Sequence, residues 1–258
     1  MSVQELTLPM VLLVMAGVFL ASFMDAIAGG GGIISLPAYL LAGLPVHTAL
    51  GTNKMSAGLG TIASTARFLK NGYVDWSLAA PSVVLAIAGA HFGTRLQLLV
   101  ADRYLQYLLL AVLPVVAFVV LRQRSFPEVR GEMARGKRLG IVLAASLLVG
   151  TYDGFYGPGT GTFLLLIYCD LAKLDVRTAC GNVKVVNLSS NMGALATSLL
   201  HGQVFLALGC IGTAMSLLGH FLGSGVAMKS GSRIVRPAVL VMLTLLAVKV
   251  VHQLAAGG

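Results

Sequence analysis

Two lysines inside apolar segments are the residues of this sequence that most directly suggest chemistry. Lys54 lies seven residues inside the apolar segment 47–69, and Lys184 lies at a matching depth in segment 178–200. A lysine so deep in a membrane helix costs on the order of 2.5–3.5 kcal/mol to insert. Two such ammonium groups gathered in one site would suit a negatively charged ligand. The alternative is that each ammonium neutralises a carboxylate, with Asp25 and Asp153 as partners.

Small polar side chains surround both lysines. Asn187 and Asn191 follow Lys184 by three and seven residues, which places the three on one face of a helix. Amide and hydroxyl donors directed inward would bind the oxygens of an oxyanion, or they would instead form hydrogen bonds between helices. The substrate-binding residues predicted beside the lysines are Thr52, Asn53, Asn182, Asn187 and Asn191.

Two glycine-rich stretches each precede a short apolar segment. Gly29–Gly32 precedes segment 33–44, and the GPGTG sequence at 157–161 precedes segment 160–172. Because these segments are too short to cross a bilayer as straight helices, we expect broken or re-entrant helices. Their backbone N–H groups and positive ends would favour an anion, although close packing between helices would also explain the glycines. The glycines predicted to bind substrate are Gly30, Gly31, Gly32, Gly159 and Gly161.

Four further residues are candidates for carrying a coupling proton. Asp25 and Asp153 come just before the glycine-rich stretches, and His91 and His220 lie in matching surroundings later in the chain. An ionisable residue inside a membrane segment is often part of a proton relay, and histidine titrates near neutral pH. A structural role held by hydrogen bonds is the alternative for each. A sodium ion is the other coupling ion that we consider.

The elements that position these residues are apolar segments that together require a membrane. The chain has 258 residues, of which 57% are hydrophobic and 10% are charged, whereas soluble domains carry about 25% charged residues. Lipid must therefore cover most of the surface, and we predict an all-α, polytopic integral membrane protein with eight to ten transmembrane helices. The predicted segments are 8–27, 33–44, 47–69, 77–98, 103–121, 138–153, 160–172, 178–200, 204–227 and 233–253.

The two halves of the chain resemble each other. The sequence HTALGTNKMSAG at 47–58 aligns with RTACGNVKVVNL at 177–188, so that the two lysines match, and the two aspartates match after a two-residue insertion in the second glycine stretch. Transporters are often built from such repeats. We predict a first transmembrane repeat at 1–125, a basic linker at 126–137 and a second repeat at 138–258. Five crossings per half would invert the second repeat, whereas re-entrant short segments would leave eight crossings and reopen that question.

The distribution of basic residues predicts the orientation. The net charge is +9, but the basic residues lie between apolar segments, so we expect no nucleic-acid partner. The region 122–138 is rich in arginine and is therefore expected to be cytoplasmic. We expect no catalytic residue, metal or cofactor, because the sequence has no HExxH motif, no acidic metal cluster and no nucleotide-binding motif.

The arrangement DAIAGGGGIISLP…HTALGTNK, echoed by the second glycine stretch and RTACGNVK, resembles the sulfite exporter TauE/SafE family, also called the toluene-sulfonate uptake permeases. The resemblance covers nearly the whole chain. It implies a bacterial inner-membrane permease with inverted repeats that moves sulfite, sulfonates or sulfoacetate. The second half departs from the family pattern, because Asn182 replaces Thr52 and neither Pro37 nor Pro45 has a proline counterpart.

These observations predict a secondary transporter for a small anion that works by alternating access around a central site lined by lysines. Its expected partners are the anionic substrate, the lipid bilayer and a coupling proton or sodium ion. An anion channel is the alternative, and an intramembrane enzyme is less favoured because no catalytic arrangement is present.

Overall fold

The computed structural model describes residues 7–105, 107 and 129–230. The predicted segment 233–253, most of segment 103–121, and residues 122–128 of the arginine-rich region 122–138 lie outside these residues. Every regular element in the described part is a helix, as predicted. The helices are α1 (Leu8–Ala28), α2 (Gly32–Leu41), α3 (Val46–Lys70), α4 (Trp76–Leu98), α6 (Arg135–Phe155), α7 (Thr160–Leu166), the π-helical η1 (Ile167–Leu171), α8 (Val176–Leu200) and α9 (Leu206–Ser230).

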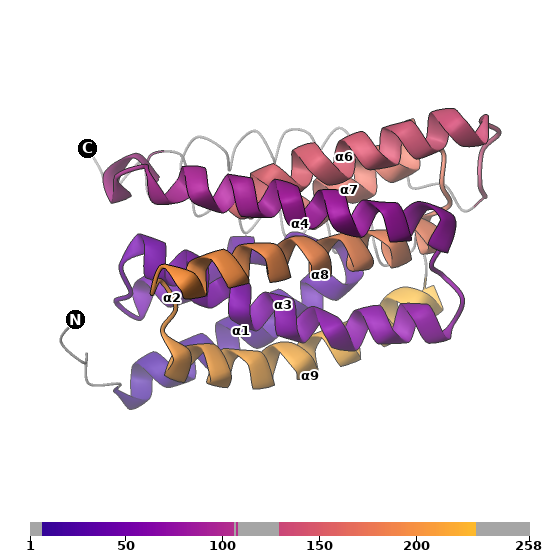
Figure 1. The fold of residues 1–258 in the computed structure, drawn as a ribbon. Helices are drawn as coiled ribbons and strands as arrows, with labels where there is room; N and C mark the ends of the chain where they lie inside the picture. Colours follow the sequence, from indigo (N-terminus) through magenta and orange to yellow (C-terminus); the bar gives the residue numbers. More distant parts are fainter. Residues whose placement is uncertain (1–6, 106, 108–128, 231–258) are drawn as a thin grey trace.

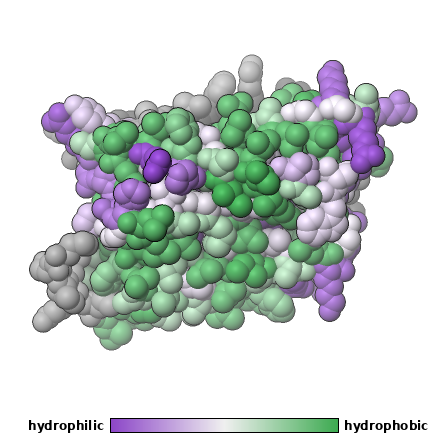
Figure 2. Space-filling model, in the orientation of Figure 1, coloured by the Kyte–Doolittle hydropathy of each residue, from purple (hydrophilic) through white to green (hydrophobic). Residues whose placement is uncertain are grey.

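Four of the described helices are long and apolar enough to cross a membrane: Leu8–Ile27, Trp76–Leu98, Arg135–Phe155 and Leu206–Lys229. Figure 2 shows apolar residues over the middle of the molecule, with many of the hydrophilic residues gathered toward the two ends. Such an apolar band flanked by polar ends fits a protein that spans a bilayer.

The long helices lie side by side and pack in a definite order (Figure 1). Helix α6 packs on α4, α4 on α8, α8 on α3, α3 on α9, and α9 on α1. The two central helices, α3 and α8, are 25 residues each and bury most of their polar side chains. In the alignment of the two halves, α1 corresponds to α6, α3 to α8 and α4 to α9. Exchanging each helix for its counterpart gives the same order of contacts read from the other end, as two equivalent halves would.

Glycines let the helices of the two halves approach closely, and they do so in matching pairs. A Cβ atom on Gly51 would overlap the carbonyl of Gln203, and one on Gly181 would overlap the carbonyl of Tyr73. Likewise, a Cβ on Gly93 of α4 would overlap α6 at Thr151, and one on Gly223 of α9 would overlap α1 at Phe23. Each contact made by a glycine of one half therefore has an equivalent made by the matching glycine of the other half. These contacts support the proposed duplication.

The short helices α2 and α7 begin at the glycine-rich stretches, as the sequence indicates. Gly29 (φ +75°) ends α1 and donates its N–H to the carbonyl of Asp25, and Gly159 (φ +89°) precedes α7. Positive φ values of this kind favour glycine. Both loops therefore turn the chain sharply inside the protein, where other helices surround them.

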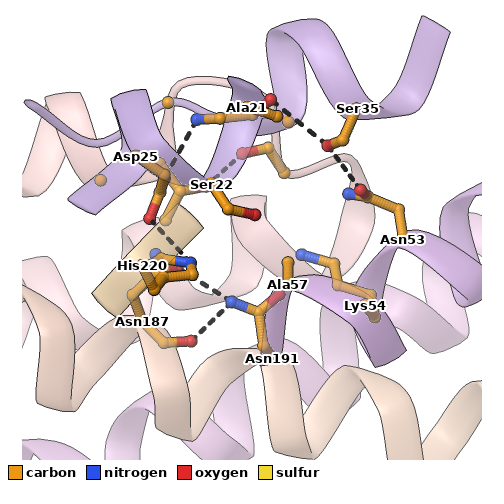
Figure 3. A pocket seen from close by; sticks show the side chains of 16 residues that line it. Ala21, Ser22, Asp25, Ser35, Asn53, Lys54, Ala57, Asn187, Asn191 and His220 are labelled. Carbon is orange, nitrogen blue, oxygen red and sulfur yellow. Dashed lines mark hydrogen bonds and ion pairs between the residues drawn. The ribbon is translucent and has the colours of Figure 1, made fainter. Parts of the chain in front are cut away.

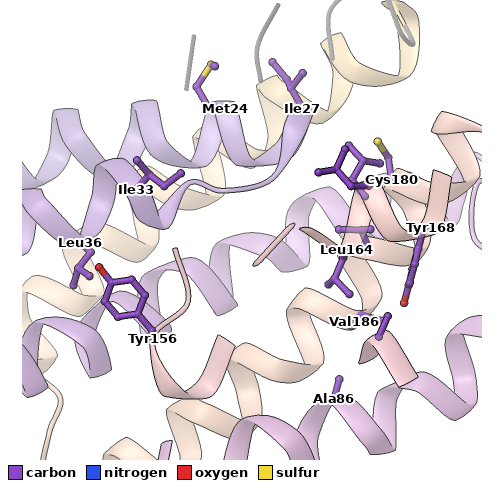
Figure 4. Close-up of a cluster of buried hydrophobic side chains, with 14 of the residues drawn as sticks. Met24, Ile27, Ile33, Leu36, Ala86, Tyr156, Leu164, Tyr168, Cys180 and Val186 are labelled. Atoms are coloured by element: carbon purple, nitrogen blue, oxygen red, sulfur yellow. The ribbon is translucent and has the colours of Figure 1, made fainter. Parts of the chain in front are cut away.

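Buried apolar side chains pack around the short helices and fix the loops (Figure 4). Leu36 of α2, Leu164 of α7 and Tyr156 at the end of α6 are each at most 1% exposed.

Just before α6 begins, Arg130 forms an ion pair of 3.1 Å with Asp75, and the N–H of Gly131 donates to the carbonyl of Lys173. The described part of the linker is thus tied to the loops that precede α4 and α8.

Candidate functional site

A polar pocket lies where the two glycine-rich loops meet the central helices (Figure 3). The pocket is small, with a cavity volume of about 30 Å³, which is room for one or two water molecules. Its walls come from α1, α2, α3, α8 and α9 and from both loops. The lining residues are Ala21, Ser22, Asp25, Gly30, Gly31, Gly32, Ser35, Asn53, Lys54, Ala57, Gly157, Thr160, Gly161, Asn187, Asn191 and His220.

Both buried lysines form ion pairs that cross between the halves of the chain. Lys54 Nζ lies 2.8 Å from Asp153 Oδ1, and Lys184 Nζ lies 2.8 Å from Asp25 Oδ2. Each lysine therefore uses the aspartate of the other half, and the two pairs are counterparts of each other. Of the two alternatives that the sequence left open, the structure contains the pairing with carboxylates, and the ammonium groups are neutralised in this conformation.

The two lysines nevertheless differ in their relation to the pocket. Lys54 is a lining residue, and Asp153 is the only ion-pair partner that the described residues give it. Lys184 does not line the pocket, and its ammonium donates both to the carboxylate and to the backbone carbonyl of Asp25. An ammonium group has three N–H donors. Lys54 therefore retains donors on the pocket side, whereas Lys184 is more fully occupied.

The two aspartates also differ in their surroundings. Asp25 lines the pocket, and its Oδ1 accepts a hydrogen bond of 3.0 Å from the N–H of Gly31. Asp153 is 2% exposed and does not line the pocket, and its second oxygen accepts a hydrogen bond of 2.7 Å from Ser190. The position that matches Ser190 in the first half is Gly60. The first half therefore has no hydroxyl at the matching position.

Replacing Ser190 with alanine is expected to destabilise the protein by about 1.5–3 kcal/mol, because the buried carboxylate of Asp153 would lose a charge-assisted donor. Thermal unfolding of the purified protein in detergent measures the effect. Ser189→Ala is the matched control, since Ser189 is also buried but donates to the carbonyl of Val185 in its own helix. Equal unfolding temperatures for the two variants would show that Ser190 does not support Asp153.

The predicted amide and hydroxyl residues divide into two groups. Asn53, Asn187 and Asn191 line the pocket, and Asn53 Oδ1 accepts a hydrogen bond of 2.6 Å from Ser35. Thr52 and Asn182 do not line it. The hydroxyl of Thr52 accepts a hydrogen bond from the N–H of Phe205, and the amide of Asn182 donates to the carbonyl of Thr178.

The glycine-rich loops contact each other beside the pocket. A Cβ on Gly29 would overlap the backbone of Gly161 and Thr162, and a Cβ on Gly161 would lie 2.8 Å from the Cα of Gly29. Of the glycines predicted to bind substrate, Gly30, Gly31, Gly32 and Gly161 line the pocket, and Gly159 does not.

The two repeat-matched histidines occupy different environments. His220 is 1% exposed and lines the pocket, with its Nε2 3.3 Å from Thr61 Oγ1 and 3.9 Å from Asp25 Oδ2. His91 is exposed and its Nδ1 lies 2.8 Å from Thr197 Oγ1. Among the proton-carrying candidates, the structure therefore brings Asp25 and His220 together at the pocket and leaves Asp153 and His91 outside it.

Four polar or backbone positions in the pocket wall were not predicted: Ser22, Ser35, Gly157 and Thr160. Ser22 precedes Asp25 by three residues, so the helical spacing places both on one face of α1 and could have identified it. No group of three or more potential metal ligands occurs among the described residues.

Comparisons with known proteins agree with a transport role. A family model described as "Sulfite exporter TauE/SafE" matches residues 14–250. A probable membrane transporter protein of Haemophilus influenzae is 34% identical over 91% of this chain and 92% of its own length. The probable membrane transporter proteins ORF9 of Sinorhizobium sp. and YfcA of Escherichia coli K12 are each 32% identical, over 95% and 91% of this chain and 94% and 87% of their own lengths. No solved structure matches the chain.

Proposed function

Because this chain belongs to the sulfite exporter TauE/SafE family and is a membrane transporter rather than an enzyme, we propose that it carries a small sulfur-containing anion, such as sulfite, a sulfonate or sulfoacetate. The observation that carries the proposal is a polar pocket at the meeting point of both halves, with a lysine ammonium in its wall. Buried cations of this kind in membrane helices are rare and usually serve transport.

The pocket offers several donors to an oxyanion. Lys54 supplies a positive charge with N–H groups not used by Asp153, and Asn53 uses its carbonyl oxygen toward Ser35, which leaves the amide nitrogen as a donor. The N-terminal end of α2 begins at Gly32 in the same wall, and the positive end of a helix favours an anion. Pyramidal sulfite and tetrahedral sulfonate groups each present three acceptor oxygens, which match such a set of donors.

Alternating access is the mechanism that we infer. The proposed repeats are 1–125 and 138–258, with the linker at 126–137 between them. They contact each other through matching pairs of glycines and through the two ion pairs that join a lysine of one repeat to the aspartate of the other. Two equivalent halves can adopt each other's conformations, which would move the opening of the site from one side of the membrane to the other. The region 122–138 would then lie in the cytoplasm and the protein in a bacterial inner membrane.

Transport by reconstituted protein tests the proposal. Proteoliposomes loaded with unlabelled methanesulfonate are expected to accumulate labelled methanesulfonate transiently from outside, because a carrier exchanges one bound anion for another. Labelled sulfite should compete in the same assay. Flux that rises linearly with concentration and shows no exchange would instead support an anion channel, and the absence of flux for every sulfur-containing anion would contradict the proposed function.

A further inference from the structure

The charges around the pocket balance each other before any anion enters. Two ammonium groups, on Lys54 and Lys184, face two carboxylates, on Asp25 and Asp153, and all four side chains are at most 12% exposed. With a neutral His220 nearby, the cluster has no net charge. An entering anion would therefore add an uncompensated negative charge in a region of low dielectric constant, where such a charge is costly.

Asp25 is the carboxylate whose charge an entering anion would meet. It lines the same pocket as Lys54, whereas Asp153 lies behind Lys54 with both oxygens bound. Like charges at close range disfavour the ionised form of a carboxylate. An anion held by Lys54 would consequently favour the protonated form of Asp25.

The groups around Asp25 can accommodate that proton. The titratable and charged groups that face it are Lys184 from α8 and His220 from α9, and Lys54 from α3 shares the pocket. If the carboxylate of Asp25 becomes neutral, Lys184 still donates to the backbone carbonyl of the same residue. No buried ammonium is then left without an acceptor.

His220 lies where it could pass the proton to Asp25. Its Nε2 is 3.9 Å from the carboxylate, and its Nδ1 is buried without a hydrogen-bond partner among the described residues. Thr61 is the other side chain at the ring. In the matching pair of the other half, Asp153 accepts a hydrogen bond from Ser190, and Nδ1 of His91 is bonded to Thr197 and is therefore not unpartnered.

We propose that each anion bound at Lys54 is accompanied by one proton on Asp25, delivered through His220, so that the protein moves an anion and a proton together. This inference rests on the proposed function. Only one of the two equivalent halves would carry the proton, although both contain the lysine, the aspartate and the histidine.

The sign of the expected pH effect follows from linkage. If the anion binds best to the form with protonated Asp25, then anion binding takes up a proton. The apparent affinity must therefore rise as the pH falls, by up to tenfold per pH unit over the range in which Asp25 is ionised in the empty site. The same linkage predicts that an inward anion gradient drives protons inward.

Proteoliposomes that contain a pH-sensitive dye measure this coupling. The probe is methanesulfonate, because it carries no titratable proton of its own, and the membrane potential is clamped with potassium and valinomycin. We expect an inward methanesulfonate gradient to acidify the interior with a ratio of about one proton per anion. Saturable uptake without acidification would contradict the coupling and leave the proposed function intact, whereas no saturable uptake at any pH would contradict both.

Variants identify the proton-carrying residue. Asp25→Asn is expected to remove the acidification and to make methanesulfonate binding independent of pH. His220→Gln is expected to slow the acidification at least tenfold, and its matched control, His91→Gln, is expected to leave the acidification at the wild-type rate. Acidification that persists in Asp25→Asn, or that slows equally in both histidine variants, would overturn the assignment. If Asp25→Asn does not fold, the histidine pair and the wild-type ratio still decide the question.

Discussion

Alanine in place of Gly29 is expected to destabilise the protein by more than about 4 kcal/mol and to leave little folded transporter. A Cβ at this position would overlap the backbone of the second glycine loop at Gly161 and Thr162. Backbone on both sides of the contact cannot rotate away as a flexible side chain could. The amount of monodisperse protein in detergent and its unfolding temperature measure the loss.

Gly72→Ala is a matched control for this substitution. Gly72 has φ +73°, close to the +75° of Gly29, but nothing lies within 4 Å of the position where a Cβ would stand. The control therefore introduces a side chain at a similar positive φ, which favours glycine, without the overlap. Similar losses in the two variants would mean that the loops do not meet as described.

Removal of the ammonium from the pocket is expected to weaken methanesulfonate binding about 10- to 150-fold, which corresponds to one charge-assisted hydrogen bond of about 1.5–3 kcal/mol. The suitable variant is Lys54→Met combined with Asp153→Asn, because Lys54→Met alone would leave a buried carboxylate without its ion-pair partner. Titration of the purified protein with methanesulfonate measures the affinity.

Asp153→Asn alone and the unfolding temperature are the controls for the double variant. The single variant keeps the ammonium, so its affinity should remain well above that of the double variant. An unchanged unfolding temperature for the double variant would show that the loss of binding is not a loss of folding. Wild-type affinity in the double variant would contradict the assignment of Lys54 to the site.

The helices were largely predictable from the sequence, because apolar segments long enough for a membrane have few other structures open to them. The short helices α2 and α7 followed from the glycines, whose positive φ values and close contacts other residues tolerate poorly. Helix α6 begins at Arg135, earlier than the predicted segment 138–153, because its first turn contains the basic residues Arg135 and Lys137, whose low hydropathy excluded them from the apolar segment.

The residue types of the site were predictable, but their ion-pair and hydrogen-bond partners were not. The burial cost identified Lys54 and Lys184, yet spacing along the chain could not show that each pairs with the aspartate of the other half. Thr52 and Asn53 are neighbours in the sequence, but a helix directs them differently, so Thr52 bonds Phe205 and Asn53 faces the pocket. Adjacent polar residues therefore do not share a role.

The alignment of the two halves also could not predict that the two histidines lie in different environments. His91 and His220 follow similar residues, but His220 lies in the pocket wall and His91 is exposed. The pocket is lined by Asp25 and His220 but by neither Asp153 nor His91, and spacing along the chain does not show this difference.

Crystals grown with selenite, a heavier analogue of sulfite, would test most directly whether this pocket binds an oxyanion. Anomalous diffraction at the selenium edge would locate the ion independently of the protein atoms. The proposed function predicts one strong peak within hydrogen-bonding reach of Lys54 Nζ and the amide of Asn53. A peak at a remote position, or none in the pocket at a concentration that inhibits methanesulfonate uptake, would contradict it.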